Sequence, residues 1–170
     1  MDYWPNVDAV VSFAHAVFPA IRRRHPDARF YIVGARPTPE VQRLADLPGV
    51  SVTGAVPDIR PYLAHAALAV APLRIARGVQ NKVLEAMAMA KAIVATPLAM
   101  QGLGTAGTEV VQTAASERLY ADLVVQVLAK HRASVPAARE RVIDRFGWSA
   151  SLRRLSDLVL SESLPVARAS

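Results

Sequence analysis

The feature that most constrains the fold is a strand–helix–strand pattern between residues 68 and 96. Residues 68–73 and residues 92–96 are short apolar segments of strand length, and residues 81–90 carry helix-forming side chains without a break. Two short apolar strands joined through a helix are typical of a right-handed crossover in a parallel sheet. The pattern therefore predicts an α/β fold.

A basic turn, RIARGVQNK at residues 74–82, connects the first of these strands to the helix. From the start of this turn to Glu85 the chain contains no acidic residue. Ligands of open parallel sheets bind at such turns, outside the carboxyl ends of the strands. Cations in a first helical turn oppose the helix dipole, so this arrangement becomes favourable when an anion binds at the helix N-terminus. The turn therefore predicts an anion site. Its candidate residues are Arg74, Arg77, Gly78, Gln80, Asn81 and Lys82.

Lys82 and Glu85 extend this hypothesis from the turn into the helix. Residues three apart share one helix face, so this pair could present an ammonium to a phosphate and a carboxylate to sugar hydroxyls. Gly78 would let the backbone approach the anion closely. The alternative is a solvated Lys–Glu pair beside two unrelated arginines, and the residues alone leave both interpretations open.

Strands and helices alternate along the rest of the chain, which predicts a doubly wound parallel sheet with helices on both faces. Asn6, Thr38 and Ser116 are expected helix N-caps, and Pro19 is expected to kink or restart the first helix. Residues 98–108, with three glycines, are expected to form a hinge loop. Further strands are expected at 28–33, 50–53 and 109–113, and helices at 7–24, 38–46, 57–65, 116–131, 135–145 and 149–162.

Length and composition predict one compact domain without metal chemistry. The chain has 170 residues, of which 52% are hydrophobic and 20% charged, and this balance excludes disorder. The absence of cysteine excludes a disulfide framework and a thiolate metal site, and it fits a reducing cytoplasm. The four histidines are scattered without metal-ligand spacing, so we expect no metal.

The formal charge of +6 raises nucleic acid and anionic membranes as partners. The basic residues are dispersed over several expected helices and are not interleaved with aromatic residues, so we expect no nucleic-acid binding. Peripheral contact with anionic lipid, at the inner face of the membrane, is the favoured interpretation of the charge.

The segment GVQNKVLEAMAMAKAIVATP resembles the donor-binding segment of the C-terminal domain in GT-B glycosyltransferases, in particular glycosyltransferase family 4, the glycosyl transferases group 1. The family typically shows E-x7-E continuing as E-A-[ML]-A-x-G-x-P-V-[VI]-A-T. The residues EAMA from Glu85 and IVAT from Ile93 match its second half. The resemblance implies that Glu85 holds the ribose hydroxyls of a nucleotide and that Lys82 lies near its diphosphate.

The segment also departs from the family pattern. Arg77 stands where the family has a glutamate that contacts the donor sugar, and Ala90 and Ala92 replace the usual Gly and Pro. Nucleotide recognition is therefore implied more directly than recognition of a particular sugar.

The resemblance extends over most of the chain. The stretch GVSVTGAVPDIRPYLAHAALAVAPL is similar to the family segment in which a loop passes the nucleobase, here at Gly54 and Val56. Gly54 can equally be an ordinary turn glycine. The residues FGWS resemble the closing segment of the family, in which Trp148 would pack in the core or between domains rather than contact substrate.

The resemblance implies transfer of a sugar from a nucleotide-diphosphate-sugar donor to a glycan or lipid-linked acceptor, with retention of configuration and without metal or cofactor. No catalytic residue is identified. Alternatives that stay open are a nucleotide-sugar epimerase of the same fold, a non-catalytic nucleotide-binding module and a flavodoxin-like regulatory domain.

Residues 1–170 match only the C-terminal domain of the GT-B fold, so the resemblance implies an N-terminal acceptor domain as partner and a first strand that lies before Met1. The first strand is central in the doubly wound order 3-2-1-4-5-6, which predicts a gap between the strands at Phe30 and Val70. We expect these strands to shift together or the gap to be filled by self-association. We also expect no glycosyl transfer by these residues alone.

Overall fold

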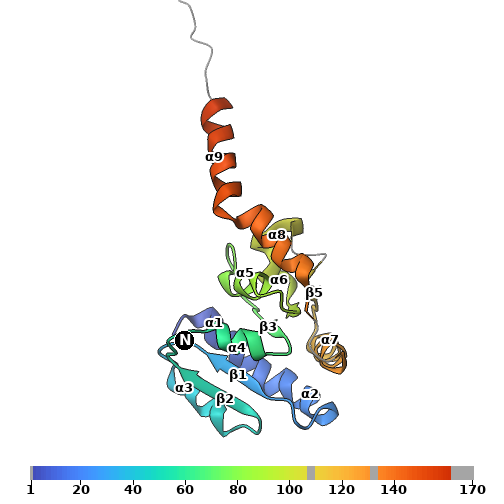
Figure 1. Cartoon of the computed structure of the whole chain (residues 1–170). Coiled ribbons are helices and arrows are strands. Elements are labelled where there is room, and N and C mark those ends of the chain that lie inside the picture. The colour runs from blue at the N-terminus through green and yellow to red at the C-terminus, as the bar shows by residue number, and fades with distance from the viewer. Residues whose placement is uncertain (1, 107–109, 131–133, 162–170) are drawn as a thin grey trace, which may run out of the picture.

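The computed structural model describes residues 2–106, 110–130 and 134–161, and it has an α/β architecture with two parallel sheets (Figure 1). One sheet pairs β1 (Phe30–Val33) with β2 (Val50–Gly54). The other contains β3 (Ala69–Ala71), β4 (Ile93–Ala95) and β5 (Gln112–Thr113), in that order. The predicted α/β class with parallel strands is confirmed.

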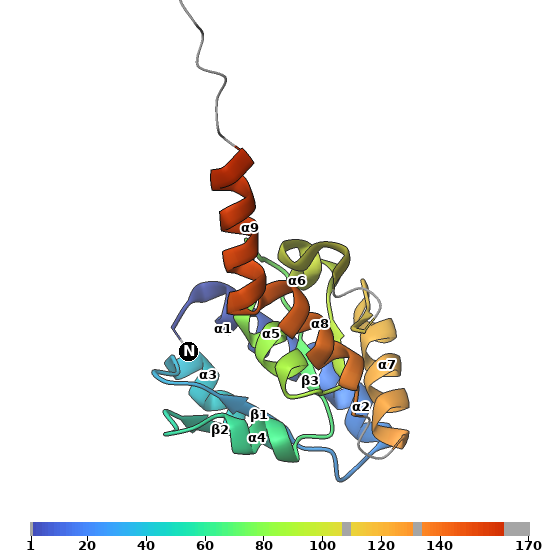
Figure 2. The ribbon, with the colours of Figure 1, turned by 45° about the horizontal axis from the view of Figure 1, so that its top comes forward.

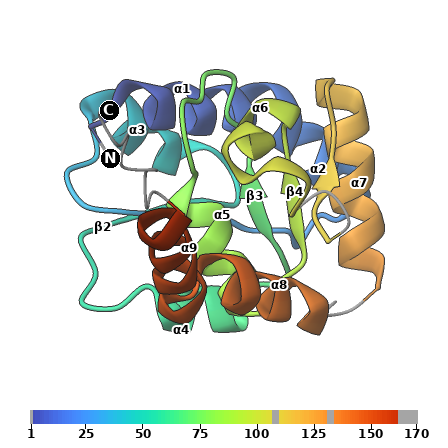
Figure 3. The same cartoon turned by 90° about the horizontal axis from the view of Figure 1, so that it is seen from above.

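Helices cover both faces of the strands. Figure 3 shows α1, α2 and α3 along one side and α4 and α8 along the other, with the strands between them. The helical segments are α1 (Trp4–Ser12), a π-helix (Phe13–Val17), α2 (Phe18–Arg24), α3 (Pro39–Arg43), a 3₁₀ turn (Leu44–Asp46), α4 (Arg60–His65), α5 (Asn81–Ala88), α6 (Pro97–Met100), a 3₁₀ segment (Gln101–Ala106), α7 (Glu117–Ala129), α8 (Pro136–Phe146) and α9 (Trp148–Ser161).

The first helix begins earlier than predicted. Its N-cap is Tyr3 and Pro5 lies in its first turn, so the prediction of Asn6 as the N-cap is wrong. The fixed φ of proline suits the first helical turn, which explains the earlier start.

The interruption predicted at Pro19 is confirmed, because the helix passes from π to α geometry at Phe18 with Pro19 in the first turn of α2. Proline has no N–H to continue the preceding hydrogen-bond ladder.

Side-chain caps fix three other helix starts. The Thr38 and Ser116 hydroxyls accept hydrogen bonds from the N–H groups of Val41 and Leu119, at 3.4 and 3.3 Å, and both caps were predicted. A third cap was missed, since the Thr96 hydroxyl accepts from the Ala99 N–H at 3.2 Å and starts α6. The prediction of a loop at residues 98–108 is therefore wrong for residues 98–106, which form part of α6 and the 3₁₀ segment that follows it.

The gap predicted in the sheet is present between β1 and β3. The two sheets are not joined by strand pairing, and their orders, β2-β1 and β3-β4-β5, are those of a doubly wound sheet with one central strand absent. The expectation that the strands would shift together is wrong, because β1 and β3 belong to separate sheets and are not paired with each other. Filling of the gap by self-association stays a prediction.

The hydrophobic core consists of two clusters of buried residues, which lie mainly on opposite faces of the strands. On the face of α1 and α2, the Phe13 ring lies 4.8 Å from the Phe30 ring and 5.7 Å from the Tyr120 ring, centroid to centroid. On the other face α5 buries Val83 and Met87 against β3, β4, α6 and α8. The buried stripe of α5 leaves its polar residues at the surface.

The C-terminal helix α9 projects away from the sheets (Figure 2). The side chain of Trp148 at its start is 83% exposed, so the prediction of core packing for Trp148 is wrong. The prediction that it packs between domains is untested. Residue 162, the last residue of the helix predicted here, lies outside the described residues.

The hydroxyl of Tyr120 in α7 is buried between two strands. It accepts a hydrogen bond from the Ala71 N–H at 3.1 Å and donates one to the Val94 carbonyl at 2.5 Å. Burial raises the pKa of Tyr120, so the hydroxyl stays protonated and keeps its donor. The tyrosine thus links β3, β4 and α7.

We predict that Tyr120→Phe lowers the free energy of unfolding by about 1–3 kcal/mol, because the substitution removes the two buried hydrogen bonds of the hydroxyl. Chemical denaturation followed by circular dichroism measures this change. Tyr31→Phe is the matched control, since Tyr31 is 49% exposed, and it should change stability by less than about 0.5 kcal/mol. Equal effects of the two substitutions would contradict a structural role for the Tyr120 hydroxyl.

Candidate functional site

The basic turn leaves the carboxyl end of β3 and enters α5, as the sequence predicted. Leu73 is buried, and its carbonyl accepts a hydrogen bond from the Thr96 hydroxyl at 2.5 Å, which fixes the start of the turn. No side chain caps the N-terminus of α5, and its first turn contains no acidic residue. The positive end of the helix dipole is therefore not neutralised within its own first turn.

The middle of the turn is held by hydrogen bonds and by a close backbone approach. The Gln80 amide donates to the carbonyls of Arg77 and Gly78, at 3.3 Å each, and Gly78 has a φ of +67°. A Cβ atom at Gly102 would lie 2.2 Å from the Gly78 carbonyl oxygen. Gly102, predicted only as part of a hinge loop, is thus required by contact with the turn.

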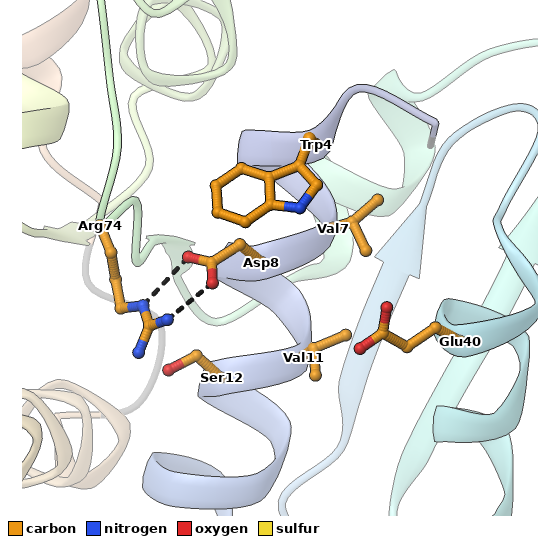
Figure 4. Close-up of a pocket in the computed structure, with 7 residues that line it drawn as sticks. All are labelled: Trp4, Val7, Asp8, Val11, Ser12, Glu40 and Arg74. Carbon is orange, nitrogen blue, oxygen red and sulfur yellow. Dashed lines mark hydrogen bonds and ion pairs between the residues drawn. The ribbon is translucent and has the colours of Figure 1, made fainter.

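Arg74 is held by a carboxylate that sequence reasoning missed. Its guanidinium donates to both carboxylate oxygens of Asp8 in α1, at 3.0 and 2.7 Å (Figure 4). Hydrogen bonding to Asp8 is the main cause that raises the pKa of Arg74. The bidentate pair neutralises Arg74 locally and ties the turn to α1.

A second tie joins the starts of α1 and α5. The Lys82 ammonium donates to the side-chain oxygen of Asn6 at 2.5 Å. Desolvation lowers the pKa of Lys82, and the attraction of Glu85 partly opposes this shift. The ammonium therefore lies where water solvates it incompletely, so a bound anion would stabilise its charged form.

The other candidate groups of the turn point to solvent. Arg77, Asn81 and Glu85 are exposed, and their side chains form no hydrogen bond or ion pair with the residues that the structure describes. The structure places Glu85 one helical turn after Lys82. The roles of Arg77, Asn81 and Glu85 as ligands stay predictions.

Gly54 and Val56 lie at the end of β2 and in the loop after it. Gly54 has a φ of +68°, and a Cβ there would meet open space, so its backbone conformation alone accounts for a glycine. Within the described part of the chain, no hydrogen bond or ion pair joins Gly54 or Val56 to the basic turn. Their proximity to a nucleobase stays a prediction.

A cavity of about 240 Å³ lies beside Arg74 and was not predicted (Figure 4). Its lining combines apolar, aromatic and charged side chains from α1, α3 and the turn after β3. These residues are Trp4, Val7, Asp8, Val11, Ser12, Glu40 and Arg74. No local pattern marks this set, because tertiary packing alone brings its three segments together.

Within residues 2–106, 110–130 and 134–161, no group of three or more His, Asp or Glu side chains is arranged to hold a metal ion. Among the helices of the same described residues, none is long and apolar enough to cross a membrane.

The family model described as glycosyl transferases group 1 matches residues 1–130, which include the basic turn, α5 and the residues that tie α1 to them. The chain belongs to the glycosyl transferases group 1 family. The resemblance stated from the sequence is therefore confirmed. No curated protein matches the chain. In this glycosyltransferase-family domain, the matched region ends just after α7, and α8 and α9 lie beyond it.

We predict that Gly102→Ala destabilises this domain by about 1–3 kcal/mol, because the added methyl group meets backbone atoms that cannot rotate away. Thermal and chemical denaturation measure the change. The neighbouring exposed Gln101→Ala is the control and should stay within about 0.5 kcal/mol of the parent chain. A Gly102→Ala chain of unchanged stability would show that the turn and the 3₁₀ segment can separate at no cost.

Proposed function

We propose that this domain binds the nucleotide-diphosphate-sugar donor of a glycosyltransferase. The enzyme transfers the sugar, with retention and without a metal, to a glycan or lipid-linked acceptor held by an N-terminal GT-B domain. The observation that carries this proposal is the family match across a basic turn that enters an uncapped helix. The alternatives to transfer, an epimerase or a non-catalytic module, would use the same nucleotide site.

The diphosphate is assigned to the start of α5. A diphosphate leaving group gains negative charge during transfer, and preorganised donors at that position stabilise the transition state. The α5 N–H groups, Lys82 and the exposed Arg77 supply such donors. Arg74 is a weaker candidate for direct contact, because Asp8 already neutralises its charge and occupies the guanidinium edge formed by Nε and one terminal nitrogen.

Glu85 is assigned to the ribose. Its carboxylate accepts hydrogen bonds without donating any, which suits two adjacent hydroxyl groups. The exposed side chain forms no hydrogen bond or ion pair with the described residues and only attracts Lys82 from one helical turn away, so binding would not require an ion pair to break. The nucleobase would then lie toward Gly54 and Val56.

The cellular setting is part of the same proposal. A donor of this kind is available in the cytoplasm, and a lipid-linked acceptor would bring the enzyme to the inner face of the membrane. The net charge of +6 supports contact with anionic lipid there.

Calorimetric titration of the chain with nucleoside diphosphates tests donor binding directly. We expect saturable binding of at least one nucleoside diphosphate. Absence of heat with every common nucleoside diphosphate, in a chain shown to be folded by circular dichroism, would overturn the proposal. Product analysis with the full-length enzyme then separates transfer from epimerisation.

Glu85→Ala should weaken nucleoside diphosphate binding by about 1–3 kcal/mol, because the ribose hydroxyls lose a charged acceptor. The dissociation constants of both chains are measured by the same titration. Glu140→Ala, an exposed substitution on α8, is the matched control and should leave affinity unchanged. Unchanged affinity in a folded Glu85→Ala chain would return Glu85 to the surface-pair interpretation.

Lys82→Met should lower affinity for the diphosphate while leaving stability equal or slightly higher, because a cation leaves the positive end of α5. Asn6→Ala separates charge from contact, since it removes the hydrogen-bond acceptor of Lys82 but keeps the ammonium. We expect Asn6→Ala to retain most of the affinity. Loss of stability without loss of binding in Lys82→Met would make Lys82 a structural partner of α1.

A further inference from the structure

The cavity of about 240 Å³, here called the cavity over α1, has a floor made of two rows of side chains. Trp4, Asp8 and Ser12 are spaced four residues apart and therefore lie along one face of the helix. Val7 and Val11 form the neighbouring apolar row (Figure 4). The volume is below the roughly 300 Å³ at which pockets for drug-sized ligands begin, so the cavity suits a ligand of one ring.

Three charged side chains border these rows. Asp8 and Arg74 are paired at 2.7 and 3.0 Å, so their charges offset each other. Glu40 of α3 lies on the other side of the cavity and forms no hydrogen bond or ion pair with the described residues. The lining therefore carries one carboxylate more than it has cations, which disfavours a phosphate here. This electrostatic character separates the cavity from the basic start of α5.

The lining offers both hydrogen-bond donors and acceptors. The donors are the indole N–H of Trp4, the Ser12 hydroxyl and the terminal nitrogen of Arg74 that does not bind Asp8, and none of them has a partner among the described residues. The acceptors are the Glu40 carboxylate and the Ser12 hydroxyl. Hydroxyl groups use donors and acceptors together, whereas an ammonium ion would use acceptors alone.

Trp4 adds an aromatic surface to this polar set. Its side chain is 59% exposed, so a ligand can reach the indole ring without displacing protein atoms. A sugar ring has an apolar face of C–H groups and an edge of hydroxyl groups. Trp4 and the row of Val7 and Val11 match the face, and Ser12 and Glu40 match the edge.

We propose that the cavity over α1 binds one neutral hexopyranose unit of a glycan. The unit stacks on Trp4 and hydrogen-bonds to Glu40 and Ser12. The site uses side chains of α1 and α3 that the proposed nucleotide site at α5 does not need, so it goes beyond the proposed function. A sugar contact of this kind would strengthen the hold on a glycan that is also bound elsewhere on the enzyme.

NMR titration of the full chain tests this site. The probes are the methyl glycosides of glucose, galactose, mannose and N-acetylglucosamine, each added separately, and the readout is the indole N–H signal of Trp4. The chain has two tryptophans, so Trp148→Phe assigns the signals and serves as the control. We expect a saturable shift of the Trp4 signal with at least one glycoside, at a millimolar dissociation constant, which is typical of so small a ligand.

Two substitutions locate the sugar, with folding checked by circular dichroism. Trp4→Ala should weaken glycoside binding about tenfold, read from ligand signals, and Trp4→Phe should retain most of it because the aromatic face remains. Glu40→Gln should weaken binding about fivefold, because an amide is a poorer acceptor than a carboxylate. Trp148→Phe should leave binding unchanged, since Trp148 does not line the cavity.

Nucleoside diphosphate affinity, measured on the same variants, should not change, so failure of the nucleotide site and failure of the sugar site are distinguishable. Absence of a Trp4 shift with all four glycosides at about 100 mM, far above the expected dissociation constant, would overturn the proposal. Glycoside binding that survives both Trp4→Ala and Glu40→Gln unchanged would also overturn it. A Trp4 shift with tetramethylammonium but with no glycoside would identify a cation site instead.

Discussion

The buried hydroxyl of Tyr120 joins the strands on which the candidate site depends. It connects the Ala71 N–H at the end of β3 with the Val94 carbonyl in β4, and its ring lies against Phe13 in the π-helix after α1, on the same face of the sheet. The basic turn begins only three residues after Ala71. The position of the turn is thus set by a core in which α7 and the helix after α1 pack together on one face of the strands.

The site takes its electrostatic character from α1 as much as from the turn. Asp8 neutralises Arg74, whereas Asn6 holds Lys82 without neutralising it. An uncharged partner leaves the ammonium available to an anion, and desolvation makes such an anion more favourable. The division of roles between the two cations follows from which residue of α1 each one meets.

Sequence reasoning succeeded where the signal is local. Thr38 and Ser116 were predicted as caps because the cap bonds a residue three positions along the chain. It failed at Asn6, where the fixed φ of Pro5 started the helix earlier, and for core packing of Trp148, one of the two positions that the family resemblance implied. Whether an apolar residue is covered depends on which elements meet it, and no local pattern records this.

The sequence by itself determined the α/β class, the crossover around the basic turn and the family. These follow from hydrophobic period, from strand order and from a motif that is contiguous in the chain. Only the tertiary structure decided the partners of Arg74 and Lys82, the contact of Gly102 with Gly78 and the cavity over α1. Each joins segments far apart in the chain, and such contacts are set by packing geometry rather than by local preference.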